Sequence, residues 1–121
     1  MDRKALIAAY RNTPRPMGVY AIRNLHDGRL LVGRSVDLPS ILNRERAQLR
    51  LRCHGNAALQ ADWNRLGESA FAYETLDTNT RPENTPGYDP AADLEALEAM
   101  WLDRLLPFDD RGYNRRPKVR T

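Results

Sequence analysis

The sequence predicts an α+β fold in which a small three-stranded antiparallel sheet is flanked by helices. Strands are expected at residues 17–24 and 29–35, on either side of a tight turn, and at about residues 70–78. Helices with one apolar face are expected between and after these strands, and packing them on the sheet is the simplest way to bury those faces. A chain of 121 residues suits one compact domain and leaves little room for a second core.

The first expected element is an amphipathic segment over about residues 3–11, which ends before the proline-broken TPRP of residues 13–16. We therefore expect residues 1–16 to form an N-terminal helix and linker. Residues 17–114 should form the folded domain, and residues 115–121 a basic C-terminal tail.

Strand and helix signals then alternate along the chain. MGVYAIRN and RLLVGRS predict a hairpin around the turn LHDG. Asp37 is a suitable N-cap and Pro39 suits the first turn of a helix over about residues 38–53. The apolar stripe of this helix, which should face the core, consists of Leu38, Leu42, Leu49 and Cys53.

The second half of the domain begins with a helix that Asn56 should cap and Gly67 should close. Residues 79–90 are polar and contain three prolines, so they predict a loop of the length that is usually functional or mobile. A long helix is expected at residues 91–106. Its apolar face consists of Leu94, Leu97, Trp101 and Leu105.

The composition excludes several classes of protein. No apolar run approaches the roughly 20 residues that span a bilayer, and the N-terminus lacks the apolar core of a signal peptide, so no membrane partner and a cytoplasmic location are expected. The single cysteine, Cys53, excludes an internal disulfide and a cysteine-rich zinc site, which agrees with a reducing compartment.

Basic residues are mostly arginine: of 19 basic side chains, only Lys4 and Lys118 are lysine. Arginine binds phosphate oxygens in pairs, which favours a phosphate-bearing partner, although a GC-rich genome would give the same bias without functional pressure. The arginines also cluster, which suits a nucleic-acid backbone. The clusters are Arg44, Arg46, Arg50 and Arg52 on one segment, and Arg115, Arg116, Lys118 and Arg120 in the tail.

Several short motifs occur in a fixed order, beginning with GVY at residues 18–20 and LVG at residues 31–33. Cys53-His54, the LQ, DWN and G of residues 59–67, Glu98 with Trp101, and the GYN of residues 112–114 follow. In this order and spacing the motifs resemble those of the GIY-YIG endonuclease family, over about residues 17–114.

The resemblance implies a nucleic-acid partner, DNA before RNA, and phosphodiester cleavage that depends on Mg²⁺ or Mn²⁺. A lone carboxylate is a reasonable magnesium site, because this ion keeps several waters and takes further ligands from substrate oxygens. By resemblance, Glu98 would be the metal ligand and Tyr20 the hairpin tyrosine nearest the nucleophile. His54 would flank the site, and Asn114 would hold the surroundings of the glutamate in place.

Each of these four residues also has a purely structural interpretation. Tyr20 could be a core residue with its hydroxyl at the surface, and Glu98 a solvated helix residue. His54 could cap the end of a helix, and Asn114 could simply turn the chain. Their joint occurrence in the family's order favours the functional interpretation.

The sequence departs from the family pattern at two catalytic positions. Leu31 stands where the family usually has tyrosine, and Ile41 where it has arginine. A hydrocarbon side chain neither relays a proton nor binds phosphate, so we expect weakened cleavage. Arg34 and Arg44 are the candidates to replace the missing cation. With Arg46 and Arg50 they are also the residues expected to bind nucleic acid.

Glu45 stands one helical turn after Ile41, where the family often has a histidine or another polar residue. It would either pair with a neighbouring arginine at the surface or join Glu98 as a second carboxylate around a metal. Three functions remain open: a metal-dependent endonuclease with a rearranged site, a non-catalytic nucleic-acid-binding module, and a protein-interaction factor of phage or mobile-element origin that uses residues 79–90 as its contact.

Overall fold

The computed structural model describes residues 15–80 and 87–116. One antiparallel sheet, in the order β2-β1-β3, contains β1 (Met17–Asn24), β2 (Leu30–Ser35) and β3 (Phe71–Asn79). The described helices are α2 (Leu38–Arg50), α3 (Ala57–Leu66) and α4 (Ala91–Leu105). The predicted α+β fold is therefore confirmed. The expected N-terminal helix lies outside the described residues, as do the middle of the expected 79–90 loop and most of the basic tail.

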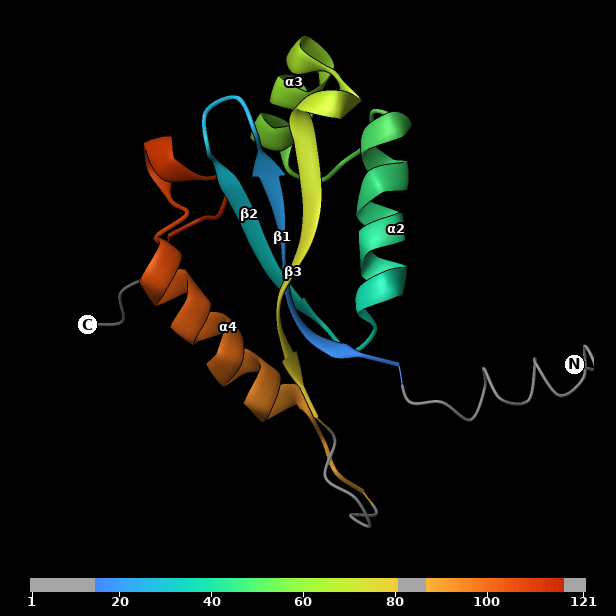
Figure 1. The fold of residues 1–121 in the computed structure, drawn as a ribbon, viewed down its shortest axis with the longest axis vertical. Helices are drawn as coiled ribbons and strands as arrows, with labels where there is room; N and C mark the ends of the chain where they lie inside the picture. Colours follow the sequence, from blue (N-terminus) through green and yellow to red (C-terminus); the bar gives the residue numbers. More distant parts are fainter. Residues whose placement is uncertain (1–14, 81–86, 117–121) are drawn as a thin grey trace, which may run out of the picture.

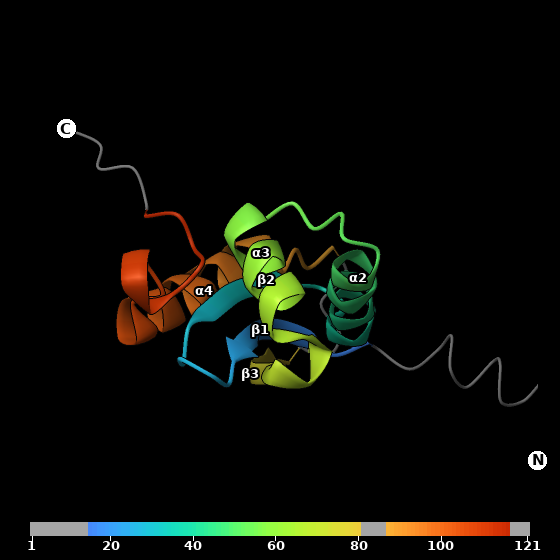
Figure 2. The ribbon, with the colours of Figure 1, turned by 90° about the horizontal axis from the view of Figure 1, so that it is seen from above.

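Helices cover both faces of the sheet. Figure 1 shows α2 and α4 on opposite sides of the strands, and Figure 2 shows the same arrangement from above. Side chains alternate between the faces of a strand, so neighbours in sequence enter different cores. Ile22 packs with Leu49 of α2 and Leu59 of α3, whereas Val19 and Val32 pack against the apolar face of α4. None of the described helices is long and apolar enough to cross a membrane.

Gly18 permits a close approach between β1 and β3. A Cβ atom at this position would stand 2.0 Å from the carbonyl oxygen of Asp77, so no other residue fits without moving the backbone. The register between the two strands also shifts between Val19 and Tyr20, because Leu76 is an extra residue on β3. Such a bulge increases the local twist and re-aims nearby side chains, and here it adjoins Tyr20.

Helix α2 begins as predicted and ends earlier. The Oδ1 atom of Asp37 accepts a hydrogen bond of 3.2 Å from the backbone N–H of Ser40, which caps the helix. The helix ends at Arg50, and Arg52 then takes a left-handed conformation with φ 59°. The prediction that Cys53 faces the core is wrong: the turn carries this residue into an exposed position.

Helix α3 is fixed at its start by Asn56, as predicted. The Oδ1 atom of Asn56 accepts from the backbone N–H of Leu59 at 3.0 Å, and its Nδ2 atom donates to the carbonyl of Tyr113 at 2.8 Å. One side chain thus caps the helix and ties the C-terminal segment to it. Gly67 closes the helix with φ 89°, a conformation that favours glycine.

Candidate active site

Tyr20 lies across Gly33 at the middle of the hairpin. The two residues are directly paired in the β1–β2 register. A Cβ atom at position 33 would stand 2.6 Å from both Cζ and the hydroxyl oxygen of Tyr20. The second glycine of the motif therefore leaves the space through which the phenol passes over the edge strand. This contact positions the Tyr20 hydroxyl for its hydrogen bond to α2.

The Tyr20 hydroxyl does not reach the surface as the structural interpretation assumed. It donates to Oε1 of Glu45 at 3.4 Å, and Glu45 is itself buried on α2. The other carboxylate oxygen, Oε2, makes a hydrogen bond with Nε2 of His54. The prediction that Glu45 pairs with an arginine at the surface is therefore wrong. Its side chain connects Tyr20 and His54 in one chain of hydrogen bonds.

The hydrogen bonds of His54 define its tautomer. The backbone N–H of Asn56 donates to Nδ1 at 3.0 Å, so this nitrogen carries a lone pair. The proton is then on Nε2, which donates it to Glu45. His54 thus holds the Glu45 carboxylate from one side while Tyr20 holds it from the other. It does not cap α2, which ends before it.

The environment of Tyr20 favours the neutral phenol. Burial raises the pKa of Tyr20 well above its usual value, and the nearby carboxylate of Glu45 raises it further. The charge of Glu98 acts in the same direction, whereas the charge of Arg44 lowers the pKa. Tyr20 is therefore a hydrogen-bond donor at neutral pH and not a phenolate base. These effects also show that Glu98 and Arg44 lie within electrostatic reach of its hydroxyl.

Glu98 approaches the site from the other face of the sheet. Its Oε1 atom accepts a hydrogen bond from Nη1 of Arg34 at 2.9 Å. Because Val32 packs on the α4 face, the alternation of β2 puts Gly33 on the α2 face and Arg34 on the α4 face. The site therefore has two halves: Tyr20 with Glu45 on one face, and Arg34 with Glu98 on the other.

Asn114 lies at the edge of β2, and the hydrogen bonds of its side chain in the described part of the chain are to Val32 and not to these groups. Its side-chain amide donates to the carbonyl of Val32 and accepts from the N–H of Val32, both at 2.8 Å. The backbone N–H of Tyr113 adds a bond of 2.8 Å to Leu30. Asn114 therefore makes the backbone hydrogen bonds to β2 that a neighbouring strand would make. These bonds hold the strand that carries Gly33 and Arg34.

The two departures from the family pattern fall beside the Tyr20 half of the site. Leu31 packs against the core under α2 and α3 and lines a groove of about 500 Å³ at the edge of β2. Asn114 and Arg115 line the same groove. Ile41 precedes Glu45 by one helical turn and so shares its side of α2. Apolar side chains thus occupy the positions where the family carries polar ones.

The four arginines expected to bind nucleic acid have different surroundings. Arg34 is paired with Glu98, Arg50 donates to Glu68 at 2.7 Å, and Arg46 lies 4.6 Å from the ring centroid of Tyr73. Arg44 is exposed on α2, and within residues 15–80 and 87–116 it has no hydrogen bond or ion pair. Of these four side chains, Arg44 is the one whose charge both faces solvent and acts on Tyr20.

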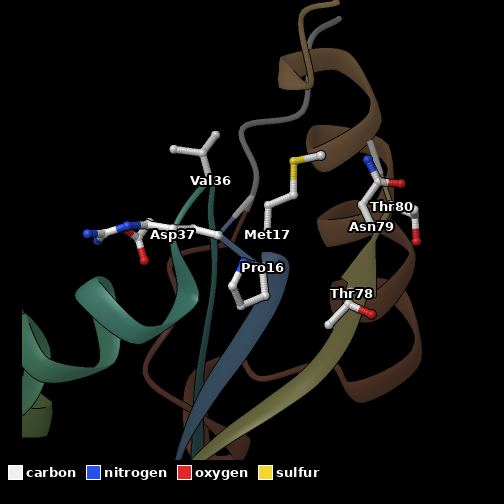
Figure 3. Close-up of a pocket in the computed structure, with 8 residues that line it drawn as sticks. Pro16, Met17, Val36, Asp37, Thr78, Asn79 and Thr80 are labelled. Atoms are coloured by element: carbon white, nitrogen blue, oxygen red, sulfur yellow. The ribbon is translucent and has the colours of Figure 1, made fainter. Parts of the chain in front are cut away.

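A hollow of about 540 Å³ lies apart from these residues (Figure 3). It forms where β1 begins, where β2 leads into α2, and where β3 ends. None of the predicted site residues lines it, so we assign it no role in the candidate site. Its lining residues are Arg15, Pro16, Met17, Val36, Asp37, Thr78, Asn79 and Thr80.

Sequence comparison identifies no relative: no family model matches the chain, and neither does any curated protein. The fold is similar to the catalytic domain of the homing endonuclease I-TevI, with a TM-score of 0.66 and 24% identity over 84% of this chain and 99% of that one. A variant of the same catalytic domain, with a glutamate replaced by alanine, gives a TM-score of 0.65 and 24% identity over 82% and 92% of the two chains.

The chain therefore has the fold of that catalytic domain, which agrees with the fold that the resemblance to the GIY-YIG endonucleases implied. I-TevI is a GIY-YIG homing endonuclease, and this chain shares the architecture of its catalytic domain.

Proposed function

We propose that this domain binds nucleic acid, DNA before RNA, around Gly33, and that it cleaves phosphodiester bonds slowly with Mg²⁺ or Mn²⁺. The observation that carries the proposal is the position of Gly33, which pairs with Tyr20 on the face that holds Glu45 and adjoins Arg34, the partner of Glu98 on the other face. The similarity to the catalytic domain of a homing endonuclease supports DNA as the partner. The exposed charge of Arg44, which lowers the pKa of Tyr20, supports attraction of a phosphate backbone.

The residues fit a weak metal site. Glu98 offers one carboxylate, and no group of three or more His, Cys, Asp or Glu side chains able to hold a metal occurs in the part of the chain that the structure describes. Magnesium accepts such a site when waters and substrate phosphates complete its shell. When bound there, the ion would neutralise charge that develops on the phosphate. Arg34 competes with it, because it already binds the same carboxylate.

The protein's own groups supply a path for a proton. The Tyr20 oxygen is free to accept a hydrogen bond from the attacking water, since its proton points to Glu45. As the water oxygen bonds to phosphorus, its proton passes to Tyr20 and the Tyr20 proton passes to Oε1 of Glu45. The P–O bond to the leaving sugar oxygen breaks, and that oxygen takes a proton from solvent water. The hydrogen bond from His54 keeps Glu45 in place for this transfer. Glu45 is then the final base, and the neutral Tyr20 is a relay.

Ile41 and Leu31 explain why cleavage should be slow. Loss of one group that stabilises developing charge commonly costs a factor of about 10² to 10³ in rate. Arg44 lies on an adjoining side of the same helix and supplies part of the missing charge. Leu31 places hydrocarbon in the wall of the groove where the family has a hydroxyl.

A non-catalytic nucleic-acid-binding module is the second candidate function. The ion pair between Arg34 and Glu98 favours it, because this pair satisfies the carboxylate without a metal. A protein-interaction role through residues 79–90 has no such support, since residues 81–86 lie outside the described part of the chain.

A cleavage assay separates the two candidates. Linear duplex, single-stranded and branched DNA, and RNA, would be incubated with Mg²⁺ or Mn²⁺ and the wild-type protein, Glu98→Ala or Glu95→Ala. Glu95 is the matched control, because it is an exposed glutamate of the same helix. Slow cleavage that Glu98→Ala abolishes and Glu95→Ala retains supports the enzyme. Equal cleavage by all three proteins indicates a contaminating nuclease, and binding without cleavage supports the module.

A further inference from the structure

Arg34 of β2 and Glu98 of α4 form an ion pair that joins these two elements. Nη1 of Arg34 lies 2.9 Å from Oε1 of Glu98, and the two side chains are 43% and 20% exposed. Within the described residues, neither side chain has another hydrogen bond or ion pair. In the described part of the chain, Arg34 is therefore the only ion-pair partner of Glu98, and Glu98 is the only one of Arg34. The pair stands next to Gly33, over which Tyr20 lies.

We propose that Arg34 is a built-in counter-ion of Glu98 that a divalent cation has to displace, so that Arg34 sets the metal affinity of this site. The inference rests on the proposed function, in which Glu98 is the carboxylate ligand. A guanidinium and a metal ion at one carboxylate repel each other strongly when little water separates them. No cluster of further acidic groups offsets that repulsion among the described residues.

Once displaced, the Arg34 side chain would be available to bind another anion. Arg34 is exposed enough to turn toward solvent, and a guanidinium binds phosphate oxygens well. Entry of the cation at Glu98 would therefore release a phosphate-binding group next to Gly33, on the α4 face of the sheet. Because Ile41 carries no charge, Arg34 would then be a cation available to bind the substrate backbone.

The inference is tested by metal binding, without any measurement of cleavage. Mn²⁺ would be titrated into ¹⁵N-labelled protein to follow paramagnetic broadening around Glu98, and Mg²⁺ affinity would be measured by calorimetry. The variants are Arg34→Ala, and Arg34→Gln, which keeps most of the side chain without the charge. Arg23→Ala is the matched control, because it frees Glu74 from a comparable ion pair, with 2.9 Å between Nε and Oε1, elsewhere on the sheet.

We expect both Arg34 variants to bind metal about three- to tenfold more tightly than wild type, since the ion pair is partly exposed and only moderately strong. Adding Glu98→Gln to Arg34→Ala should abolish the gain, and Arg23→Ala should show none. Equal affinity of wild type and the Arg34 variants would overturn the inference while leaving Glu98 as the metal ligand. Absence of metal binding in the wild type and in every variant would also overturn the inference. The proposed function would then be tested separately, by measuring DNA binding in the absence of metal.

Discussion

Tyr20 and Gly33 are paired residues of the hairpin, and the phenol of one occupies the space that a side chain of the other would fill. A Cβ atom on Gly33 would stand 2.6 Å from the Tyr20 hydroxyl oxygen. A side chain at position 33 would therefore displace the phenol of Tyr20. The position of Tyr20 in turn decides its hydrogen bond to Glu45.

Replacement of Gly33 by alanine should displace the Tyr20 ring, because a new Cβ atom has no room beside it. Overpacking of this kind costs about 1–3 kcal/mol of unfolding free energy. Urea denaturation measures the loss. Gly55→Ala is the matched control, since nothing lies within 4 Å of a Cβ atom there and the backbone is not left-handed. Equal stability of the two variants would show that Tyr20 does not lie across Gly33.

Tyr20 should titrate above the ordinary tyrosine value of about 10. Because its pKa is raised in the folded state, the folded protein keeps a proton that the unfolded chain loses. The contribution of this pKa shift to the free energy of unfolding is present in full below a pH of about 10. It is lost as the pH rises through the pKa of the folded state. NMR of ¹³Cζ-labelled tyrosine measures this titration, and Tyr20→Phe assigns the resonance.

Glu45→Gln should lower the pKa of Tyr20, because it removes a nearby negative charge. Burial, the largest cause of the raised pKa, remains in this variant and keeps the value above 10. A Tyr20 midpoint near 10 in the wild-type protein would contradict the buried position of its hydroxyl.

Asn114→Ala should destabilise the edge of the sheet. It leaves both the N–H and the carbonyl of Val32 without the partners that the amide supplies. Unpaired groups of this kind cost about 1–3 kcal/mol. Hydrogen exchange should quicken at Val32, whereas Asn43→Ala, at an exposed position of α2, should change neither stability nor exchange at Val32. Unchanged protection of Val32 would mean that Asn114 does not hold this strand.

Ile41→Arg should increase cleavage, because it returns a cation to the side of α2 that carries Glu45. The gain should approach the factor of about 10² that one charge-stabilising donor contributes. Single-turnover cleavage of a labelled duplex measures it. Ile41→Gln, a polar side chain without charge, should give little gain. If Ile41→Arg binds DNA more tightly and still cleaves at the wild-type rate, loss of this arginine is not the cause of slow turnover.

Much of the fold could be predicted because local signals agree with it. Asp37 and Asn56 cap their helices as their side chains suggest, and the predicted first strand coincides with β1. The end of α2 could not be predicted, because the left-handed turn at Arg52 has no glycine or proline to mark it. That turn is what exposes Cys53.

The candidate site was only partly predictable. Motif order indicated Tyr20, His54 and Glu98, but not that Glu45 links the first two. The helical period contained the signal, because Glu45 falls on the stripe between Leu38 and Leu49, where a charged residue needs a buried partner. The pairing of Arg34 with Glu98 depends on the contact between β2 and α4, which no local pattern specifies.

Binding to DNA, measured against salt, tests the central claim most directly. A labelled duplex of about 20 base pairs would be titrated by fluorescence anisotropy, without metal, over a range of NaCl concentrations. Each phosphate neutralised should contribute about −0.9 to the slope of log K against log salt. Arg44→Ala should weaken binding and reduce the magnitude of the slope by about one, whereas Arg65→Ala, an exposed arginine of α3, should change neither. A flat response to salt, or equal effects of the two substitutions, would contradict nucleic-acid binding at the Gly33 site.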